Sequence, residues 1–442
     1  MLLIGNGRLI TRDVNRRIIE DGCVAIKDNV VVEVGLTSDL RLKFPEARFI
    51  DARGKLVMPG LINTHTHFYS TFARGISLKD PPPTNFREIL SRLWWRLDKA
   101  LTLDDLYYSA MVTIVDCIKN GVTTVFDHHA SPNWVAGSLF RIASATQKAG
   151  LRSCLSYEVS DRDGEAIAAR GIQENMEFIR HCRQTKDPML KAIFGLHASL
   201  TLSDRTLDRC LEENAGTGVG YHVHAAEGEE DRKDAQTRYG MGVIERLQLR
   251  GVLGTKSIAV HCVHISEGEI EILKETGTNV VHNPESNMGN AVGVSPVLKM
   301  VERGVILGMG TDGYTSDMME SLKVANCLHK HANRHPSVAW AEPPQMLFEN
   351  NRIIAGKYFE KPVGQLVPGA YADVIIVDYN PPTPLTPENL ESHLLFGVSG
   401  RSVETTVING RVVMEDRKLM TVDEEAIMAK SRELTATVWK RF

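Results

Sequence analysis

The middle of the chain repeats one pattern eight times: a short apolar run and then an amphipathic stretch. The runs expected to be strands are 56–64, 122–128, 151–158, 190–197, 219–224, 257–262, 278–282 and 305–311. Short runs rich in Val, Ile and Leu are typical of parallel strands buried on both faces. Eight such units in about 300 residues predict an α/β fold, specifically a (β/α)8 TIM barrel and not an open doubly wound sheet. If two or three runs are buried helix instead, this prediction fails.

Two of the intervening stretches carry helix-start patterns. Thr102 is followed three residues later by Asp105, and Ser266 is followed three residues later by Glu269. A hydroxyl followed three residues on by an acidic side chain is typical of a capped helix N-terminus. We therefore expect a helix to begin just after Thr102 and another just after Ser266.

Both ends of the chain have the composition of short strands and turns. The strand-like runs there are 22–27, 30–34, 372–378, 403–410 and 411–414. The dipeptide Asn409-Gly410 favours a tight hairpin turn between the last two runs. We predict that residues 1–56 and 357–442 form one small composite β-sandwich domain and that residues 57–356 form the barrel.

Composition limits the partners of the chain. Its 442 residues carry a formal net charge of −4, which gives no reason to expect nucleic acid or an anionic membrane. No apolar run approaches the roughly 18 residues that span a bilayer, and the start lacks the basic segment of a signal peptide. The seven cysteines are scattered without a C-x-x-C pair, against both a disulfide framework and a thiolate zinc site. We expect a cytoplasmic enzyme for a small molecule, with a homodimer as the default assembly.

A His-x-His pair, His65 and His67, closes the first expected barrel strand. Side chains two residues apart in a strand lie on the same face, so both imidazoles point into the mouth of the barrel. Two converging neutral imidazoles suit zinc or ferrous iron. Such a pair is a weak signal by itself, and its position at a strand's carboxyl end strengthens it.

The fifth expected strand ends with a second such pair, His222 and His224, followed by Glu227. The spacing allows His224 to bind a metal while Glu227, on the loop beyond the strand, reaches a substrate. His222 is either a partner of a ligand or a core histidine. The acidic residues that follow Glu227 are better explained as the solvated start of a helix.

Two more polar residues stand at expected strand ends. His261 closes the sixth strand, and Asp312 follows the eighth, where an aspartate can bind a metal and accept a proton from its water. The glycines from Gly308 to Gly313 match G-x-G-x-x-G, but an acidic residue among them would repel a pyrophosphate. We therefore assign this segment to the metal site and not to a dinucleotide.

The number of metal ions follows from the fourth expected strand. Barrel hydrolases with two metals bridge them through a modified lysine at the end of this strand. Here Lys191 lies at its beginning and His197 at its end. We predict one divalent metal, Zn²⁺ or Fe²⁺, and expect His197 to contact the substrate.

As a set, the motifs resemble the amidohydrolase superfamily, in particular its aminohydrolase and chlorohydrolase group. The matching segments are 59–67 (PGLINTHTH), 223–227 (VHAAE), 282–287 (HNPESN), 310–313 (GTDG), 364–373 and 407–410. They span nearly the whole chain. The resemblance implies a metal held by the ligand set His65, His67, His224 and Asp312.

The resemblance also implies a mechanism. The metal would lower the pKa of a water, and His261 and Asp312 would take its proton. Glu227 would protonate a ring nitrogen and then the departing amine. The resulting activity is deamination of a purine, pyrimidine or pterin-like ring with release of ammonia. The alternatives are hydrolysis of another leaving group, such as chloride from a triazine, and a catalytically inactive homologue.

The sequence predicts the substrate-contacting residues less sharply than the metal ligands. A flat apolar slot for a heterocycle would take its walls from Tyr69, Trp94, Trp95, Trp134 and His197, although aromatic residues pack equally often between strands and helices. Asp98 stands where the resemblance implies a substrate-contacting carboxylate, one methylene shorter than the usual glutamate. One of the adjacent His128 and His129 is expected to face the pocket.

Overall fold

A computed structural model describes residues 1–15 and 17–442 and contains two parallel sheets in the middle of the chain. One has the order β6-β7-β8-β9 and the other the order β10-β11-β12-β13-β14. The bounds are β6 Leu61–Thr66, β7 Val122–His129, β8 Arg152–Tyr157, β9 Leu190–Ala192, β10 Phe194–Ala198, β11 Tyr221–Ala225, β12 Ile258–His261, β13 Asn279–His282 and β14 Leu307–Met309. The predicted α/β class with parallel strands is confirmed.

The two parallel sheets approach each other at both of their edges. Only Ile193 separates β9 from β10, and Val159 pairs with Leu196 across that junction. At the other edge Thr66 forms a parallel bridge with Asp312. The first and last strands of the series therefore lie side by side, and their carboxyl ends share one face.

The strand expected over residues 56–64 is in fact two strands, β5 (Leu56–Pro59) and β6, separated by Gly60. A Cβ atom at Gly60 would lie 2.2 Å from the side chain of Thr123, so no larger residue fits this crossing. β5 pairs with strands of the terminal sheet, whereas β6 pairs with β7. The single-strand prediction was wrong because it did not detect this change of sheet.

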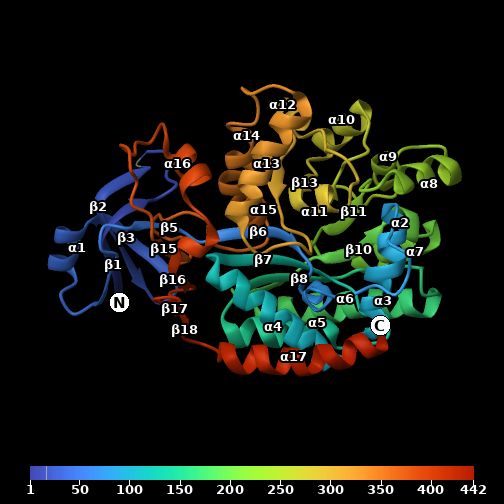
Figure 1. Ribbon diagram of the computed structural model, residues 1–442, viewed down its shortest axis with the longest axis horizontal. Coiled ribbons are helices and arrows are strands. Elements are labelled where there is room, and N and C mark those ends of the chain that lie inside the picture. The colour runs from blue at the N-terminus through green and yellow to red at the C-terminus, as the bar shows by residue number, and fades with distance from the viewer. Residues whose placement is uncertain (16) are drawn as a thin grey trace.

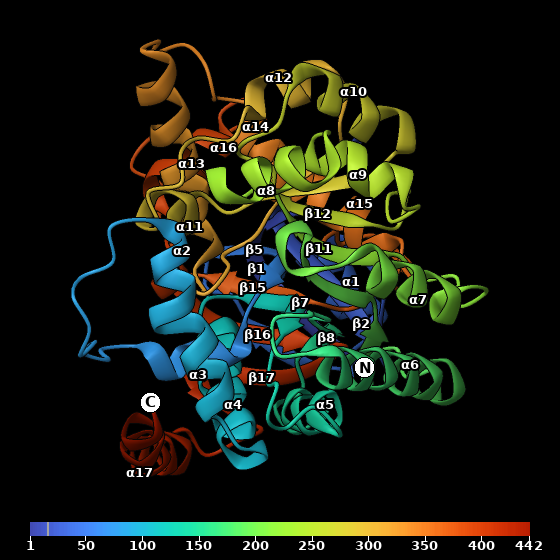
Figure 2. The same ribbon diagram turned by 90° about the vertical axis from the view of Figure 1, so that its right-hand side faces the viewer.

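Helices surround the parallel strands (Figure 2). The longer ones are α4 Leu103–Lys119, α5 Ser138–Ala149, α6 Glu165–Thr185, α7 Asp204–Asn214, α10 Glu267–Thr276 and α13 Met318–Asn333. Both predicted caps are present: the Thr102 and Ser266 side chains accept hydrogen bonds from the backbone N–H groups of Asp105 and Glu269. Each cap of this kind contributes about 1 kcal/mol.

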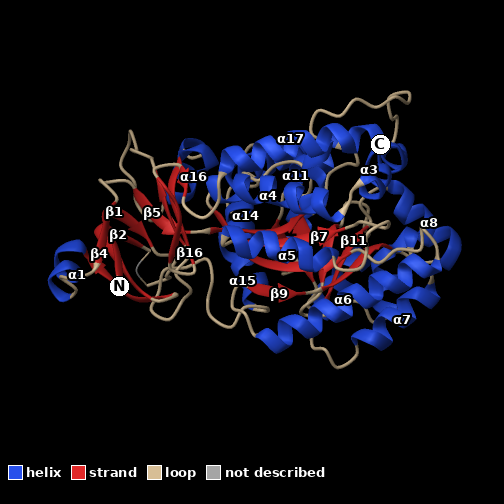
Figure 3. Ribbon diagram, turned by 90° about the horizontal axis from the view of Figure 1, so that it is seen from below, coloured by secondary structure: helices blue, strands red, loops and turns tan. Residues whose placement is uncertain are grey.

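The two ends of the chain form one nine-stranded sheet, on the left in Figure 1 and red in Figure 3. Its order is β18-β17-β16-β15-β5-β1-β2-β3, with β4 paired to β1. The bounds are β1 Leu2–Ile10, β2 Ile18–Lys27, β3 Val30–Leu36, β4 Arg48–Asp51, β15 Val374–Val377, β16 Val403–Ile408, β17 Arg411–Glu415 and β18 Lys418–Leu419. Asn409 and Gly410 both have positive φ, which confirms the predicted hairpin turn between β16 and β17.

A buried ion pair joins the terminal sheet to the parallel strands. The guanidinium of Arg152, on β8, donates to both carboxylate oxygens of Asp373 at 3.1 Å, and neither side chain is more than 1% exposed. The Asp373 carboxylate also accepts the Asn409 N–H at 2.7 Å. Arg152 further donates to the Pro188 carbonyl and lies 4.0 Å from the ring of Tyr371. The pair therefore fixes the two parts of the chain at their junction.

The C-terminal helix, α17 (Glu424–Arg441), returns to the barrel side of the molecule and runs along α4 (Figure 1). Trp439 donates its indole N–H to the Phe72 carbonyl at 2.8 Å. Every helix in the described residues is too short or too polar to span a lipid bilayer.

Replacing Arg152 by Met should destabilise the protein by about 3–5 kcal/mol, because Asp373 would keep a buried charge without its partner. Denaturation by urea, followed by circular dichroism, measures the change. Arg48→Met is the matched control, since its ion pair with Glu415 is exposed and should count for little. Equal midpoints for the two variants would contradict the assigned role of the buried pair.

Candidate active site

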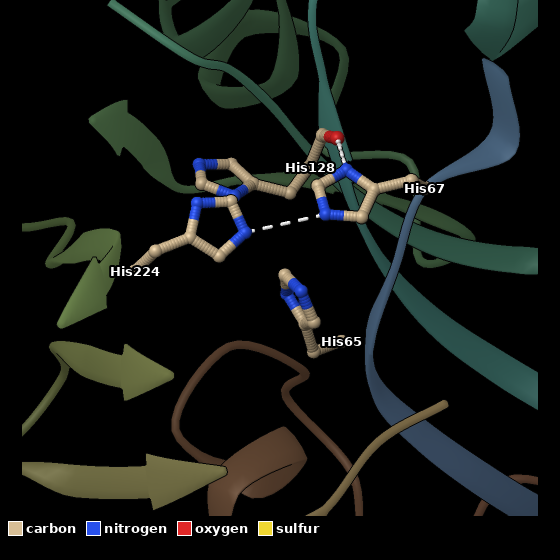
Figure 4. A group of neighbouring side chains, drawn as sticks. All are labelled: His65, His67, His128 and His224. Carbon is tan, nitrogen blue, oxygen red and sulfur yellow. Dashed lines mark hydrogen bonds between the residues drawn. The ribbon is translucent and has the colours of Figure 1, made fainter. Parts of the chain in front are cut away.

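The carboxyl ends of the parallel strands bring the predicted ligands together. His65 and His67 come from the end of β6, His224 from β11, and Asp312 follows β14 (Figure 4 shows the histidines). The Nε2 atom of His67 lies 3.2 Å from the Nε2 atom of His224 and 3.2 Å from a carboxylate oxygen of Asp312. The Nε2 atom of His65 lies 3.9 Å from that same oxygen. Residues distant in the sequence thus meet at one point.

The hydrogen bonds of His67 and His224 leave both Nε2 lone pairs facing each other. The Nδ1–H of His67 donates to the carbonyl of His128, and that of His224 donates to the carbonyl of His197 at 2.9 Å. Two lone pairs at this separation repel unless a cation lies between them. Two nitrogen ligands on tetrahedral zinc stand about 3.3 Å apart, given Zn–N bonds of about 2.05 Å. The geometry of this pair therefore fits a bound metal.

His65 also presents an Nε2 atom that is suited to bind a metal. Its Nδ1 is hydrogen-bonded to Nε2 of His222 at 2.9 Å, and its own Nε2 is buried with no hydrogen-bond partner among the described residues. Burial, with the neighbouring imidazoles, lowers the pKa of His65 well below its usual value, so the ring is neutral and able to bind a metal. His222 is therefore placed as a partner of a predicted ligand, one of the two interpretations that the sequence left open.

The structure distinguishes the two adjacent histidines of β7. The ring of His128 stacks on that of His222 at 4.4 Å and lies within the group of predicted ligand histidines (Figure 4). The ring of His129 is instead hydrogen-bonded to the hydroxyl of Ser131 at 2.9 Å. Of the two, His128 faces the metal-binding group, although neither lines the pocket described below.

Asp312 and His261 stand at the centre of the site. The Asp312 carboxylate accepts hydrogen bonds from the hydroxyl of Ser286 and the backbone N–H of Gly313. Nε2 of His261 lies 3.7 Å from Asp312 and 3.5 Å from the carboxylate of Glu227, while its Nδ1 is held by Asn287 at 2.8 Å. His261 therefore faces both acidic groups.

The backbone at these strand ends is in an unfavourable conformation. His261, Asp312 and Ala226 have φ values of 71°, 54° and 49°, in the left-handed region. A non-glycine residue there costs on the order of 1–3 kcal/mol, and such residues concentrate at functional sites. The fold tolerates this cost at the turns that direct the acidic and imidazole groups inward.

Glu227 is suited to carry a proton. Burial raises the pKa of its carboxyl group well above the usual value, and the nearby charge of Asp312 raises it further. A carboxyl group with a raised pKa can be protonated at neutral pH and can donate that proton. The structure thus places an acid 3.5 Å from His261 at the edge of the ligand group.

The predicted metal ligands lie beside a pocket, and three of them, His67, His224 and Asp312, line it. Its lining combines aromatic and polar side chains, among them Tyr69, Phe86, Trp94, Trp95, Glu158, Arg162, His197, His224, Glu227 and Asp312. The predicted slot residues His197 and Trp94 do line this pocket. The prediction for Trp134 was wrong, because that side chain is 47% exposed and lies outside the lining.

Asp98 lies behind the pocket wall and not on it. Its carboxylate is buried and forms an ion pair with Arg162, whose guanidinium does line the pocket. Asp98, on α3 (Trp95–Ala100), therefore does not line the pocket itself. It contacts Arg162, a lining residue that is 64 positions away in the sequence. Direct contact with a substrate, expected from the resemblance, would require this pair to open.

Sequence reasoning missed Glu158 and Arg162. Glu158 comes directly after β8, is 4% exposed, and lies 3.7 Å from Nε2 of His197 and 3.4 Å from Nδ1 of His67. The rule that identified His261 and Asp312, a polar residue at the carboxyl end of a strand, also applies to Glu158. No local pattern marks Arg162, which the fold alone brings to the pocket.

Comparison with known proteins gives the family. The family model described as "Amidohydrolase family" matches residues 56–413, which include every predicted ligand. The chain belongs to the amidohydrolase family. It is therefore an enzyme, and the resemblance inferred from its motifs is confirmed.

Two relatives match this amidohydrolase over 98% of its length and 97% of theirs, each at 33% identity. They are named 5-methylthioadenosine/S-adenosylhomocysteine deaminase, from Pelotomaculum thermopropionicum, and 5'-deoxyadenosine deaminase, from Methanosarcina mazei. The fold resembles that of an adenosine deaminase from Xanthomonas campestris with bound zinc, with a TM-score of 0.88, 23% identity and coverage of 99% and 98%. It also resembles an atrazine chlorohydrolase from Arthrobacter aurescens complexed with zinc, with a TM-score of 0.81, 22% identity and coverage of 98% and 100%.

Replacing His224 by Ala should remove most of the bound metal, because the variant loses one of the two facing Nε2 ligands. His222→Ala should weaken metal affinity by a smaller factor, about 10–100-fold, because only the partner of His65 is lost. Elemental analysis after dialysis against graded chelator concentrations measures both. His264→Ala is the control, since that ring is bonded to the Val292 carbonyl. Full metal content in His224→Ala would refute the ligand assignment.

Proposed function

We propose that this enzyme hydrolyses a carbon–nitrogen bond of an amino-substituted heterocycle, of purine, pyrimidine or pterin type, and releases ammonia. The observation that carries the proposal is the placement of Glu227 beside His261 at the edge of a histidine and aspartate ligand group, in an aromatic pocket. The two relatives at 33% identity, both named as deaminases, support it.

The ligands fit one divalent metal, and we propose zinc, with ferrous iron as the alternative. His65, His67 and His224 present imidazole nitrogens and Asp312 a carboxylate, a donor set that suits either ion. Lys191, on β9, pairs with Glu360 and so is not available to bridge two metals. When bound, the metal supplies a water of lowered pKa as the nucleophile.

The residues around the metal position would then handle protons. His261 and Asp312 would take the proton of the attacking water, since Nε2 of His261 lies 3.7 Å from the Asp312 carboxylate. Glu227 would donate its proton to the ring nitrogen of the substrate. Its carboxylate would then pass the second proton of the added water to the amine, which leaves as ammonia, and the proton held by His261 and Asp312 would restore Glu227. Burial, together with the nearby charge of Asp312, raises the pKa of Glu227, which favours the protonated form that this role needs.

The pocket walls would hold the ring. The rings of Trp94 and Tyr69 lie 6.4 Å apart at an interplanar angle of 89°, so a substrate ring would meet one of them by its face and the other by its edge, and His197 offers an Nε2 atom beside the ligand group. The Nδ1 atom of His197 is bonded to Thr201 at 2.7 Å, which orients the ring. We propose that His197 and Trp94 contact the substrate and that Asp98 acts on it through Arg162.

We also propose a division of the chain into two domains. Residues 57–356 would form a closed (β/α)8 barrel, and residues 1–56 and 357–442 a β-sandwich. The bridge between Thr66 and Asp312 and the contiguous β9 and β10 support closure of the barrel. β5 and α17 cross this division, because β5 pairs in the terminal sheet and α17 packs along α4.

A cytoplasmic homodimer completes the proposal. All seven cysteines are free thiols, and six of them are buried, which suits a reducing compartment. Symmetric dimers are the commonest assembly of soluble enzymes. Sedimentation velocity would decide the oligomeric state.

Glu227→Gln should retain the metal and lose about 10²–10⁴-fold in kcat, because the amide keeps the size of the side chain and cannot donate the proton. Metal analysis and ammonia release by the same preparation measure both. Glu229→Gln is the matched control two residues away, where the side chain is paired with Arg232 on the surface. Equal kcat values for Glu227→Gln and the wild type would exclude Glu227 as the proton donor.

A substrate panel tests the reaction class. The metal-loaded enzyme should release ammonia from at least one of a set of aminopurines, adenine nucleosides, cytosine and aminopterins, measured by coupled glutamate dehydrogenase. Chlorotriazines and alkylaminotriazines in the same panel test the alternative leaving groups. Chloride or alkylamine release without any ammonia release would replace deamination by that alternative.

A further inference from the structure

Arg162 is a cation in the pocket wall whose charge is already neutralised. Its guanidinium forms an ion pair with Asp98, and the side chains are 10% and 1% exposed. Its Nε atom lies 3.2 Å from the carboxylate of Asp163, which also pairs with Lys99. The central carbon of the guanidinium lies 5.4 Å from the ring centroid of Trp95, which also lines the pocket. The arginine is therefore held from two sides by carboxylates.

The remaining charged groups around the pocket are mostly acidic. Besides the metal ligand Asp312 and the proposed acid Glu227, the lining includes Glu158, Glu230 and Asp231. The other lining cation, Arg87, is exposed at the rim. Among the described residues, no buried lysine or arginine of this pocket is left without a carboxylate partner. Apart from Arg87 at the rim and the proposed metal, an anionic group on a substrate would therefore meet carboxylates in this pocket.

Opening the Asp98–Arg162 pair for an anionic ligand would be strongly unfavourable. Asp98 is fully enclosed, and one of its carboxylate oxygens already has no hydrogen-bond partner. If Arg162 turned to an incoming anion, a buried carboxylate would be left without its counter-ion. Like charges placed close together in a desolvated site also reject a ligand rather than merely failing to attract it.

We propose that Asp98, by holding Arg162, makes this pocket select uncharged substrates and reject those that carry a carboxylate or phosphate group. This inference rests on the proposed deaminase function and names its substrate class: neutral amino-heterocycles, free or attached to a neutral sugar. Asp98 is then a positioning residue that determines specificity, and it does not take part in the chemistry.

The test compares substrates that differ by one anionic group. The pairs are adenosine with adenosine 5'-phosphate, and pterin with pterin-6-carboxylate. The wild-type enzyme should favour the neutral member by about tenfold or more in kcat/KM. Asp98→Asn should raise the ratio of anionic to neutral kcat/KM by about tenfold, chiefly through KM, because Arg162 becomes free to bind the anion.

Two further variants separate this effect from a general change of shape. Asp98→Glu keeps the charge and should restore rejection of the anionic member. In the double variant Asp98→Asn/Arg162→Gln the gain should disappear, because the freed guanidinium is absent. If Asp98→Asn does not fold, Asp163→Asn decides the matter, since it removes the second carboxylate beside Arg162 and should shift the same ratio in the same direction.

The outcomes distinguish the two proposals. Equal kcat/KM for both members of a pair in the wild type, or an unchanged ratio in the folded Asp98 variant, would overturn charge selection. If no member of either pair is deaminated, the proposed function fails for these rings. Charge selection is then judged by isothermal titration calorimetry with the same compounds: tighter binding of the neutral members supports it, and equal binding overturns it.

Discussion

The geometry of the site depends on backbone carbonyl groups of neighbouring strands. The ring of His67, from β6, is held by the carbonyl of His128 on β7, and the ring of His224, from β11, by the carbonyl of His197 on β10. Each bond fixes a tautomer and turns Nε2 toward the shared centre. A shift in the register of one strand would move both a ligand and its anchor. The ligand group is therefore a property of the parallel pairing and not of any one segment.

Many polar side chains are buried at the candidate metal site, and hydrogen bonds to neighbouring residues offset much of the cost of removing them from water. His65 is paired with His222, Asp312 accepts a hydroxyl and a backbone N–H, and Asn287 holds His261. The Nε2 atoms of His65 and His261 have no hydrogen-bond partner among the described residues. Buried polar atoms without partners are unfavourable unless something binds there. A metal and its water would satisfy both, and this need links the stability of the fold to its proposed chemistry.

The wider pocket decides what that chemistry acts on. Chains of the same fold are named as an adenosine deaminase and an atrazine chlorohydrolase, so the fold does not by itself select a leaving group. In this chain the lining includes Tyr69, Trp94 and Trp95, and its buried cation, Arg162, is neutralised by Asp98. These walls are the basis for the uncharged ring substrates that we propose.

The sequence alone determined most of the parallel strands and the positions of the candidate ligands at their ends, because alternation within a strand and a helix cap act over two to four residues. It therefore predicted the parallel strands, both caps and the pair His65 and His67. Tertiary structure alone decided the break at Gly60, which of two adjacent histidines faces the site, and the pairing of Asp98 with Arg162. Those features depend on which distant segments come into contact. Contacts of that kind arise only when the strands are paired and the helices packed, so no local pattern encodes them.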